Sequence, residues 1–263
     1  MEHSQSCRAD MCYAISSGQP LRFSILASLS STLGISDRFL TRSVVDIIQF
    51  GRSDLIIVNR EFLEALELLY SISEAMTAYY RCGSGDRVII SNSIYVVEYR
   101  LTSLNCRSLR DRSYEFASPA ETGRLDLGEA LGIACQMFLH LGVRDVNVRV
   151  DRHKRLFGRL LAALPQERNF EELVAPRWYL CVLLWIFSMG ATDAINVVAR
   201  GFHIRGMAQI CSVLMVNSGE EFEDCLREVL WLDPFSSRIA RQSWDDINMF
   251  WLGDVHILSL IHI

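Results

Sequence analysis

Cysteine, histidine and carboxylate side chains are the groups in this chain that could do chemistry, and the first of them lie close to its start. His3, Cys7 and Cys12 could each bind zinc. A structural zinc site usually takes four ligands in closely paired spacings, and these positions do not provide them. We therefore expect no metal site in this segment.

Cys135 and His140 could serve as a nucleophile and its base. On an α-helix, a separation of five residues turns two side chains about 140° apart around the axis, so these two cannot share a proton or a ligand. We expect Cys135 to lie in the core. We expect His140 to be a helix-end residue, where the helix dipole favours a basic group.

The sequence contains no recognisable motif for nucleotide binding or for acyl-transfer catalysis by a serine nucleophile. The stretch Gly83-Ser84-Gly85 lacks the third glycine and the preceding strand of a dinucleotide-binding fingerprint, and no Walker lysine follows a glycine-rich loop. A G-x-S-x-G nucleophile elbow is also missing from the sequence. The sequence therefore predicts a turn at residues 83–85, and neither a catalytic residue nor a cofactor-binding residue.

Charged side chains gather in two places. The acidic group consists of Glu220, Glu221, Glu223, Asp224, Asp245 and Asp246. Adjacent carboxylates such as Asp245 and Asp246 point to different sides of a helix, so we expect solvated faces and favourable first-turn charges. The basic group consists of Arg149, Arg152, His153, Lys154, Arg155 and Arg159. It could contact phosphate or an acidic partner, but we favour a solvated amphipathic face.

Three tryptophans, Trp185, Trp231 and Trp244, stand in apolar helical contexts. Each would bury a large area and needs a partner for its indole N–H. We expect them to anchor a helical core. A ligand pocket walled by these rings is the alternative.

The elements that must position these residues are helices. Apolar residues recur every three to four positions along most of the chain, which predicts an all-α fold, an irregular array of about nine or ten packed helices. Residues 87–104 are rich in β-branched side chains, yet they keep a helical stripe and are predicted as helix. The longest loop is expected at 106–124. The expected helices cover 21–29, 36–48, 60–80, 87–104, 126–141, 152–164, 177–190, 202–216, 220–232 and 236–250.

The predicted organisation is a single helical domain over residues 21–257, preceded by a disordered lead-in over 1–20. The final residues, 258–263, match the translation of a common sequencing adapter, and we expect them to be a non-native tail. The natural chain would then be cut short near Ile257.

Composition places the chain among globular proteins. Of its 263 residues, 50% are apolar and 22% are charged, and the net charge of -5 offers phosphate no general attraction. Its eight cysteines form no C-x-x-C pair, and an N-x-[ST] sequon and the apolar core of a signal peptide are both missing. We expect reduced, buried thiols and an intracellular location. The apolar run 179–191 is too short to span a membrane and is expected to be a buried helix.

Two segments carry a resemblance to a known family. They are Leu183-Leu184-Trp185-Ile186-Phe187-Ser188-Met189-Gly190-Ala191 and Leu226-Arg227-Glu228-Val229-Leu230-Trp231-Leu232-Asp233, the second followed by Ile239 to Ile247 with Trp244. In these packing signatures the chain resembles the fungal-specific transcription factor regulatory domain, the helical region downstream of zinc-cluster DNA-binding modules. The resemblance covers roughly residues 35–250 and includes no catalytic residue.

The resemblance implies a non-enzymatic regulatory or interaction domain that acts on transcription through protein partners, a homodimer or a small-molecule effector. The six-cysteine zinc cluster of full members is missing, since Cys7 and Cys12 have the wrong spacing, so direct DNA binding is not expected. The nucleus is the implied location, with the cytoplasm as the alternative. The alternative function is an all-α enzyme or small-ligand carrier with a pocket inside the helical array.

Overall fold

The structure is a computed structural model that describes residues 60–83, 87–112, 127–144, 151–165, 169–170, 173, 175–192 and 197–261. These residues form eight α-helices. They are α3 (Arg60–Cys82), α4 (Arg87–Arg112), α5 (Leu127–Phe138), α6 (Asp151–Ala163), α7 (Arg177–Thr192), α8 (Val197–Leu214), α9 (Gly219–Arg227) and α10 (Phe235–Ile261).

The all-α prediction is confirmed, since the described residues contain helices and no strand. Each of the eight helices corresponds to one expected from apolar periodicity. The helix count is a little lower than predicted, because the helices expected at 21–29 and 36–48 lie outside the described residues. The lead-in 1–20 and most of the loop 106–124 lie outside them as well, although the backbone of residues 106–112 belongs to α4.

The β-branched segment after residue 87 is helical, and it forms the first part of α4. Val97 and Leu101 are completely buried, one turn apart, and Ile90 and Val96 are buried beside them. Burial of this stripe against neighbouring helices outweighs the intrinsic strand preference of valine and isoleucine, which is a weak and context-dependent effect.

The helix expected to close at Gly142 continues past it. After α5 the chain makes a π-helical turn over Leu139–Val143, and the Arg144 N–H donates to the Leu139 carbonyl at 3.0 Å. A Cβ atom at Gly142 would lie 2.7 Å from the Phe235 ring. Gly142 therefore permits a close approach of α10 within the helical segment, and the end predicted at residue 141 was two residues too early.

The helix expected over 220–232 is shorter than predicted. Ser218 caps α9 by accepting from the Glu221 N–H at 3.2 Å, and the helix ends at Arg227. The following residues leave the helix and lead to α10, so Leu230 and Trp231 lie on a connecting segment. Apolar spacing in the sequence does not separate this buried connection from a last helical turn.

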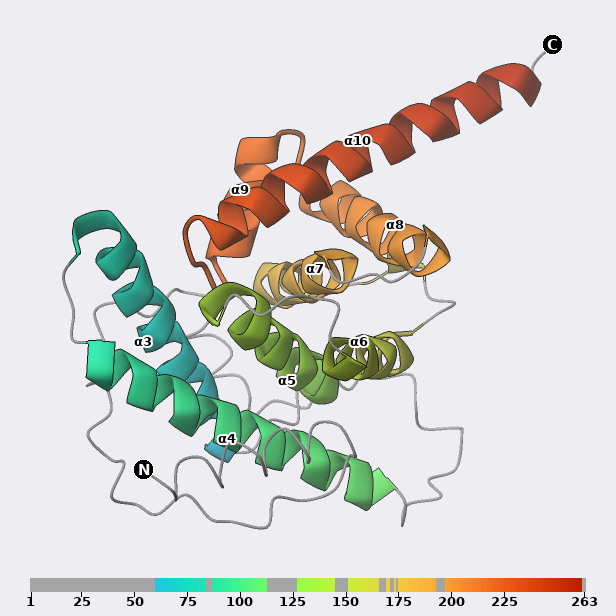
Figure 1. Cartoon of the computed structure of the whole chain (residues 1–263). Helices are drawn as coiled ribbons and strands as arrows, with labels where there is room; N and C mark the ends of the chain where they lie inside the picture. Colours follow the sequence, from blue (N-terminus) through green and yellow to red (C-terminus); the bar gives the residue numbers. More distant parts are fainter. Residues whose placement is uncertain are drawn as a thin grey trace.

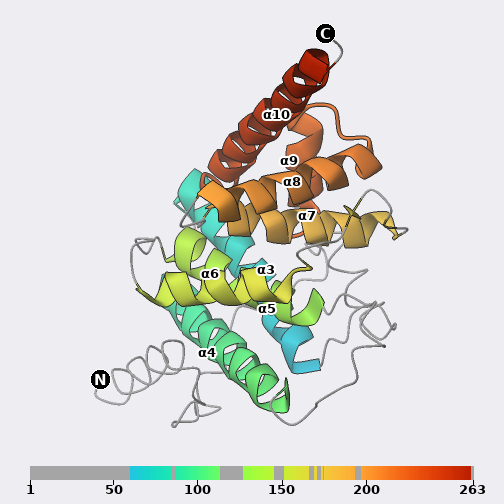
Figure 2. The ribbon, with the colours of Figure 1, turned by 90° about the vertical axis from the view of Figure 1, so that its right-hand side faces the viewer.

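The helices pack largely in chain order (Figure 1). Helix α3 lies against α4, α4 against α5, and α5 against both α6 and α7. Figure 2 shows α6, α7 and α8 one above another, with α9 and α10 on the side of α8 that faces away from α6. The last part of α10 extends beyond the other helices (Figure 1). Its backbone stays helical through Ile261, across the boundary expected at residue 257.

Helix α7 is the central helix of the core. Every residue from Tyr179 to Ala191 is buried, which confirms the buried helix predicted for this run. None of the described helices combines the length and the apolar character needed to cross a bilayer.

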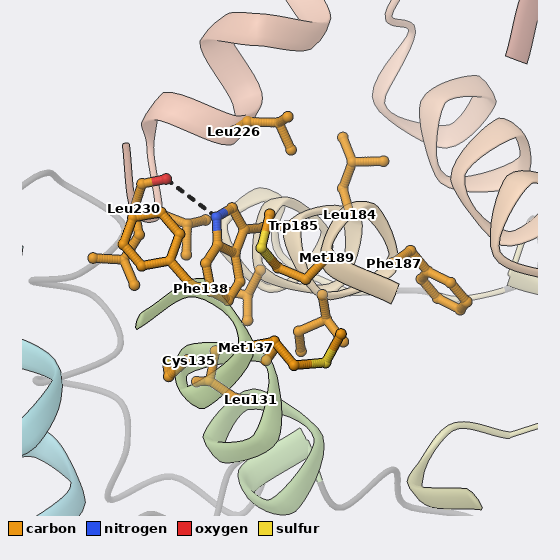
Figure 3. Packing of buried hydrophobic residues seen from close by; sticks show 14 of the residues in the cluster. Leu131, Cys135, Met137, Phe138, Leu184, Trp185, Phe187, Met189, Leu226 and Leu230 are labelled. Carbon is orange, nitrogen blue, oxygen red and sulfur yellow. Dashed lines mark hydrogen bonds between the residues drawn. The ribbon is translucent and has the colours of Figure 1, made fainter. Parts of the chain in front are cut away.

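Trp185 on α7 joins three parts of the core (Figure 3). Its indole N–H donates to the Leu230 carbonyl at 3.1 Å, and its ring lies 5.8 Å from that of Phe138 on α5. The predicted role of Trp185 as a core anchor with a paired N–H is confirmed. Trp231 is also buried, and its N–H donates to Asp233 Oδ1 at 2.7 Å.

Candidate functional site

A buried polar cluster lies where α4 packs against the end of α5 and its π-helical turn. Glu98 on α4 is 4% exposed and His140 is completely buried. The Glu98 Oε1 atom lies 3.1 Å from His140 Nε2, and Glu98 Oε2 lies 2.5 Å from Arg144 Nη2. One carboxylate therefore binds both a histidine and an arginine from the opposite helix.

The antiparallel register of α4 and α5 builds this cluster. Glu98 and Thr102 are one helical turn apart, and so are Gln136 and His140. The Gln136 side-chain amide donates to Thr102 Oγ1 at 2.8 Å. This second polar contact between α4 and α5 lies one helical turn away from the contact between Glu98 and His140. The guanidinium of Arg144 lies 4.8 Å from the centre of the Tyr95 ring. Two polar rows thus pair with each other inside an apolar interface.

Helix α6 covers the other side of this cluster. His153 is completely buried, and its ring centre lies 5.6 Å from that of His140. Arg159 Nη2 lies 3.5 Å from Glu129 Oε1 on α5. Glu129, in the first turn of α5, is buried in this ion pair.

The basic face predicted for α6 is therefore only partly solvated. Lys154 and Arg155 are exposed as expected, but the expectation was wrong for His153 and for Arg159, which face the core. Arg149 and the side chain of Arg152 lie outside the described residues. His140 does lie in a last helical turn, but it binds a carboxylate inside the protein.

Burial decides what this cluster can do. A carboxylate paired with histidine is a common arrangement for proton transfer, yet both oxygens of Glu98 are already bound and the side chain is enclosed. A substrate could reach it only if α4 and α5 moved apart. The cluster therefore acts in positioning the helices: it stabilises one register of α4 on α5, since any other register would leave these charges unpaired.

A third buried histidine, on α8, packs against α7. His203 is completely buried, and within the described residues neither of its ring nitrogens has a hydrogen-bond partner. Its ring centre lies 5.6 Å from those of Phe157 and Phe187 and 5.3 Å from that of Phe202. This apolar burial lowers the pKa of His203 to about 4, so His203 is a neutral core residue at physiological pH.

A surface groove of about 500 Å³ lies between α9 and α10. Its lining residues are Gly219, Glu220, Glu223, Asp224, Arg227, Arg241 and Trp244. The ring of Trp244 is half-buried, and its centre lies 5.8 Å from that of Phe222. Trp244 thus combines packing on the core with a partly exposed surface, unlike the other two tryptophans.

The acidic residues behave largely as predicted. Glu220, Glu221 and Asp224 are exposed, with the first two in the opening turn of α9. Asp245 is also exposed, whereas Asp246 forms a 2.6 Å ion pair with Arg200 on α8. Asp245 and Asp246 therefore lie on different sides of α10, as their adjacency predicts.

The remaining candidates from the sequence lie at a turn, in the core or outside the described residues. Gly83 has a φ of 65° and ends α3 as a turn residue, while residues 84–85 lie outside the described part, as do His3, Cys7 and Cys12. Cys135 is buried in the core, as expected. Over the described ranges, no three His, Cys, Asp or Glu side chains converge as metal ligands would.

Comparison of the chain with known protein families, curated proteins and solved structures found no match.

Sequence reasoning did not single out Glu98 or His203, and it placed His153 on a solvated basic face. The available signal for Glu98 was a carboxylate beside the apolar stripe of α4, one turn before Thr102. A charge at such a position needs a buried partner, but its identity depends on which helix packs there.

Proposed function

We propose that the chain is a non-enzymatic helical domain that regulates transcription through a protein partner, as the resemblance to the fungal transcription factor regulatory domain implies. The observation that carries the proposal is the contact between the segments behind that resemblance. Trp185, from the first segment, donates its indole N–H to Leu230, from the second (Figure 3). These packing signatures therefore belong to one continuous core.

The groove between α9 and α10 is the surface that we assign to the partner. Its lining is mostly charged, with Trp244 as the aromatic element. Small-molecule pockets are mainly apolar, whereas tryptophan and arginine are enriched among the residues that dominate protein interfaces. Three carboxylates, on Glu220, Glu223 and Asp224, favour a protein segment that presents a basic side chain next to an apolar one.

The test fuses the full chain to an unrelated DNA-binding module and measures a reporter gene, together with co-purification of nuclear proteins. A change in reporter output and a saturable partner are expected. The variant Asp224→Arg reverses a charge in the groove and should abolish both effects. Asp245→Arg makes the same change at an exposed position of α10 outside the groove lining and should abolish neither. A folded monomer with no partner and no reporter effect would refute the proposal.

The second candidate is a small-ligand carrier or an all-α enzyme, and the half-exposed Trp244 ring in a groove of ligand size favours it. A thermal-shift screen against a metabolite library should then show stabilisation that grows with ligand concentration. The variant Trp244→Ala should abolish that response. A flat response across the library would count against this candidate and leave the first one standing.

A further inference from the structure

Two cysteines that are far apart in the sequence meet between α7 and α9. Cys181 lies on α7 and Cys225 on α9, and both are completely buried free thiols. Their side chains are hydrogen-bonded to each other. Of the remaining described cysteines, Cys135 is enclosed by apolar groups and Cys82 is exposed at the end of α3. Cys211 on α8 is also buried, and burial together with the charge of Cys225 raises its pKa.

An arginine lies directly beside the pair. Arg177, one turn before Cys181, donates from Nη2 to the Cys225 Sγ atom at 3.5 Å. The same guanidinium donates to Glu228 Oε1 at 3.1 Å. Two donors, the Cys181 thiol and the Arg177 guanidinium, therefore point at the sulfur of Cys225.

The groups around the pair shift the pKa values of the two thiols in opposite directions. The hydrogen bond from Cys181, together with the charge and the hydrogen bond of Arg177, lowers the pKa of Cys225. The same contact with Cys225, together with burial, raises the pKa of Cys181. Cys225 is therefore the more acidic thiol of the pair and the better candidate for the attacking sulfur, with Cys181 as the candidate resolving thiol.

The pair lies just beneath the protein surface. The Arg177 and Glu228 side chains that form the ion pair beside Cys225 are 56% and 32% exposed. A surface ion pair of this kind contributes little to stability. An outward swing of Arg177 is the movement that would open a path for a small oxidant to the buried Cys225.

We propose that Cys225 and Cys181 form a peroxide-oxidisable dithiol that closes into a disulfide between α7 and α9. The Cys225 thiolate attacks hydrogen peroxide, its sulfur takes one oxygen as a sulfenic acid, and the departing hydroxide takes a proton from solvent to become water. The Cys181 sulfur then attacks Cys225 Sγ, and the hydroxyl leaves with the Cys181 proton as a second water. The two thiols lose two electrons and the peroxide gains them. This site is independent of the proposed role in transcription.

The test treats the full chain with hydrogen peroxide near neutral pH, alkylates the remaining thiols after denaturation, and identifies each cysteine by peptide mass spectrometry. A peptide cross-linked through Cys181 and Cys225 is the expected main oxidised product, while Cys135 stays reduced. Recovery of both cysteines as thiols, at a peroxide concentration that oxidises Cys82, would overturn the proposal. Oxidation of Cys225 without the cross-link would overturn it as well.

Variants separate the roles within the pair. Cys181→Ser should leave Cys225 as a sulfenic acid that a 1,3-diketone reagent captures, and Cys225→Ser should leave Cys181 reduced. Arg177→Gln should slow the oxidation by about threefold for each unit by which the pKa of Cys225 rises, because the loss of thiolate is partly offset by its greater nucleophilicity. Arg81→Gln is the matched control, since Arg81 forms a surface ion pair with Asp233 away from the thiols. Equal rates in the Arg177→Gln variant and the wild type would contradict the assignment of Arg177.

Discussion

The neutral histidine enclosed between α7 and α8 makes the stability of this protein depend on pH. The pKa of His203 is about 4 in the folded chain, against about 6.5 for an unfolded histidine. Between these values the unfolded chain binds a proton that the folded chain does not, so lowering the pH favours unfolding. The stability contribution of the neutral ring is complete above pH 6.5 and is lost as the pH falls towards 4.

The size of the effect follows from the two pKa values. Going from pH 7.5 to pH 5 should remove about 2 kcal/mol of unfolding free energy through this one residue. With a urea dependence of about 2 kcal/mol per molar, the unfolding midpoint should move by about 1 M. Other groups titrate over the same range, so the measurement needs a variant that differs at position 203 alone.

The variant His203→Phe removes the titrating group and keeps a ring beside Phe157, Phe187 and Phe202. Its absolute stability will differ because a larger ring has to be accommodated near Gly190, but only the pH dependence is compared. Urea unfolding at pH 7.5 and pH 5, followed by circular dichroism, should show a loss that is about 2 kcal/mol smaller in the variant than in the wild type. Equal losses in the two proteins would refute the assignment of a buried neutral imidazole.

Three further predictions concern urea unfolding near neutral pH. Glu98→Gln should lower the unfolding free energy by about 3 kcal/mol, because it leaves a buried arginine uncompensated, whereas Glu64→Gln, in an exposed pair, should change it by less than about 1 kcal/mol. Trp185→Phe should lower the unfolding free energy by about 2 kcal/mol, because the buried Leu230 carbonyl loses its hydrogen-bond donor. An unchanged urea midpoint would contradict the importance of that hydrogen bond. Gly190→Ala should destabilise the protein, because the added Cβ would lie 2.2 Å from a buried ring. Gly201→Ala, with nothing within 4 Å of the added Cβ, should stabilise it by up to about 1 kcal/mol; the same sign for both glycine variants would contradict the close packing at 190.

The fold class followed from apolar spacing because helix periodicity is local. Residues three and four apart share a face whatever the rest of the chain does, so the eight described helices could be located before any packing was known. The run 179–191 shows this best: it is apolar all round, and every residue in it is buried. The connection after α9 shows the limit, since a buried segment can be apolar without being helical.

The sites depend instead on contacts between distant residues. Glu98 meets His140 because α4 and α5 pack antiparallel in one register, and Cys225 meets Cys181 although the sequence holds no C-x-x-C motif. His203 carries no local sign that three phenylalanines from different helices enclose it. The sequence by itself determined the helical class and the approximate position of each described helix, because backbone hydrogen bonds and side-chain spacing act over a few positions. Only the tertiary structure decided which charges, thiols and rings share a buried space, because desolvation and pairing depend on neighbours that lie tens of residues away.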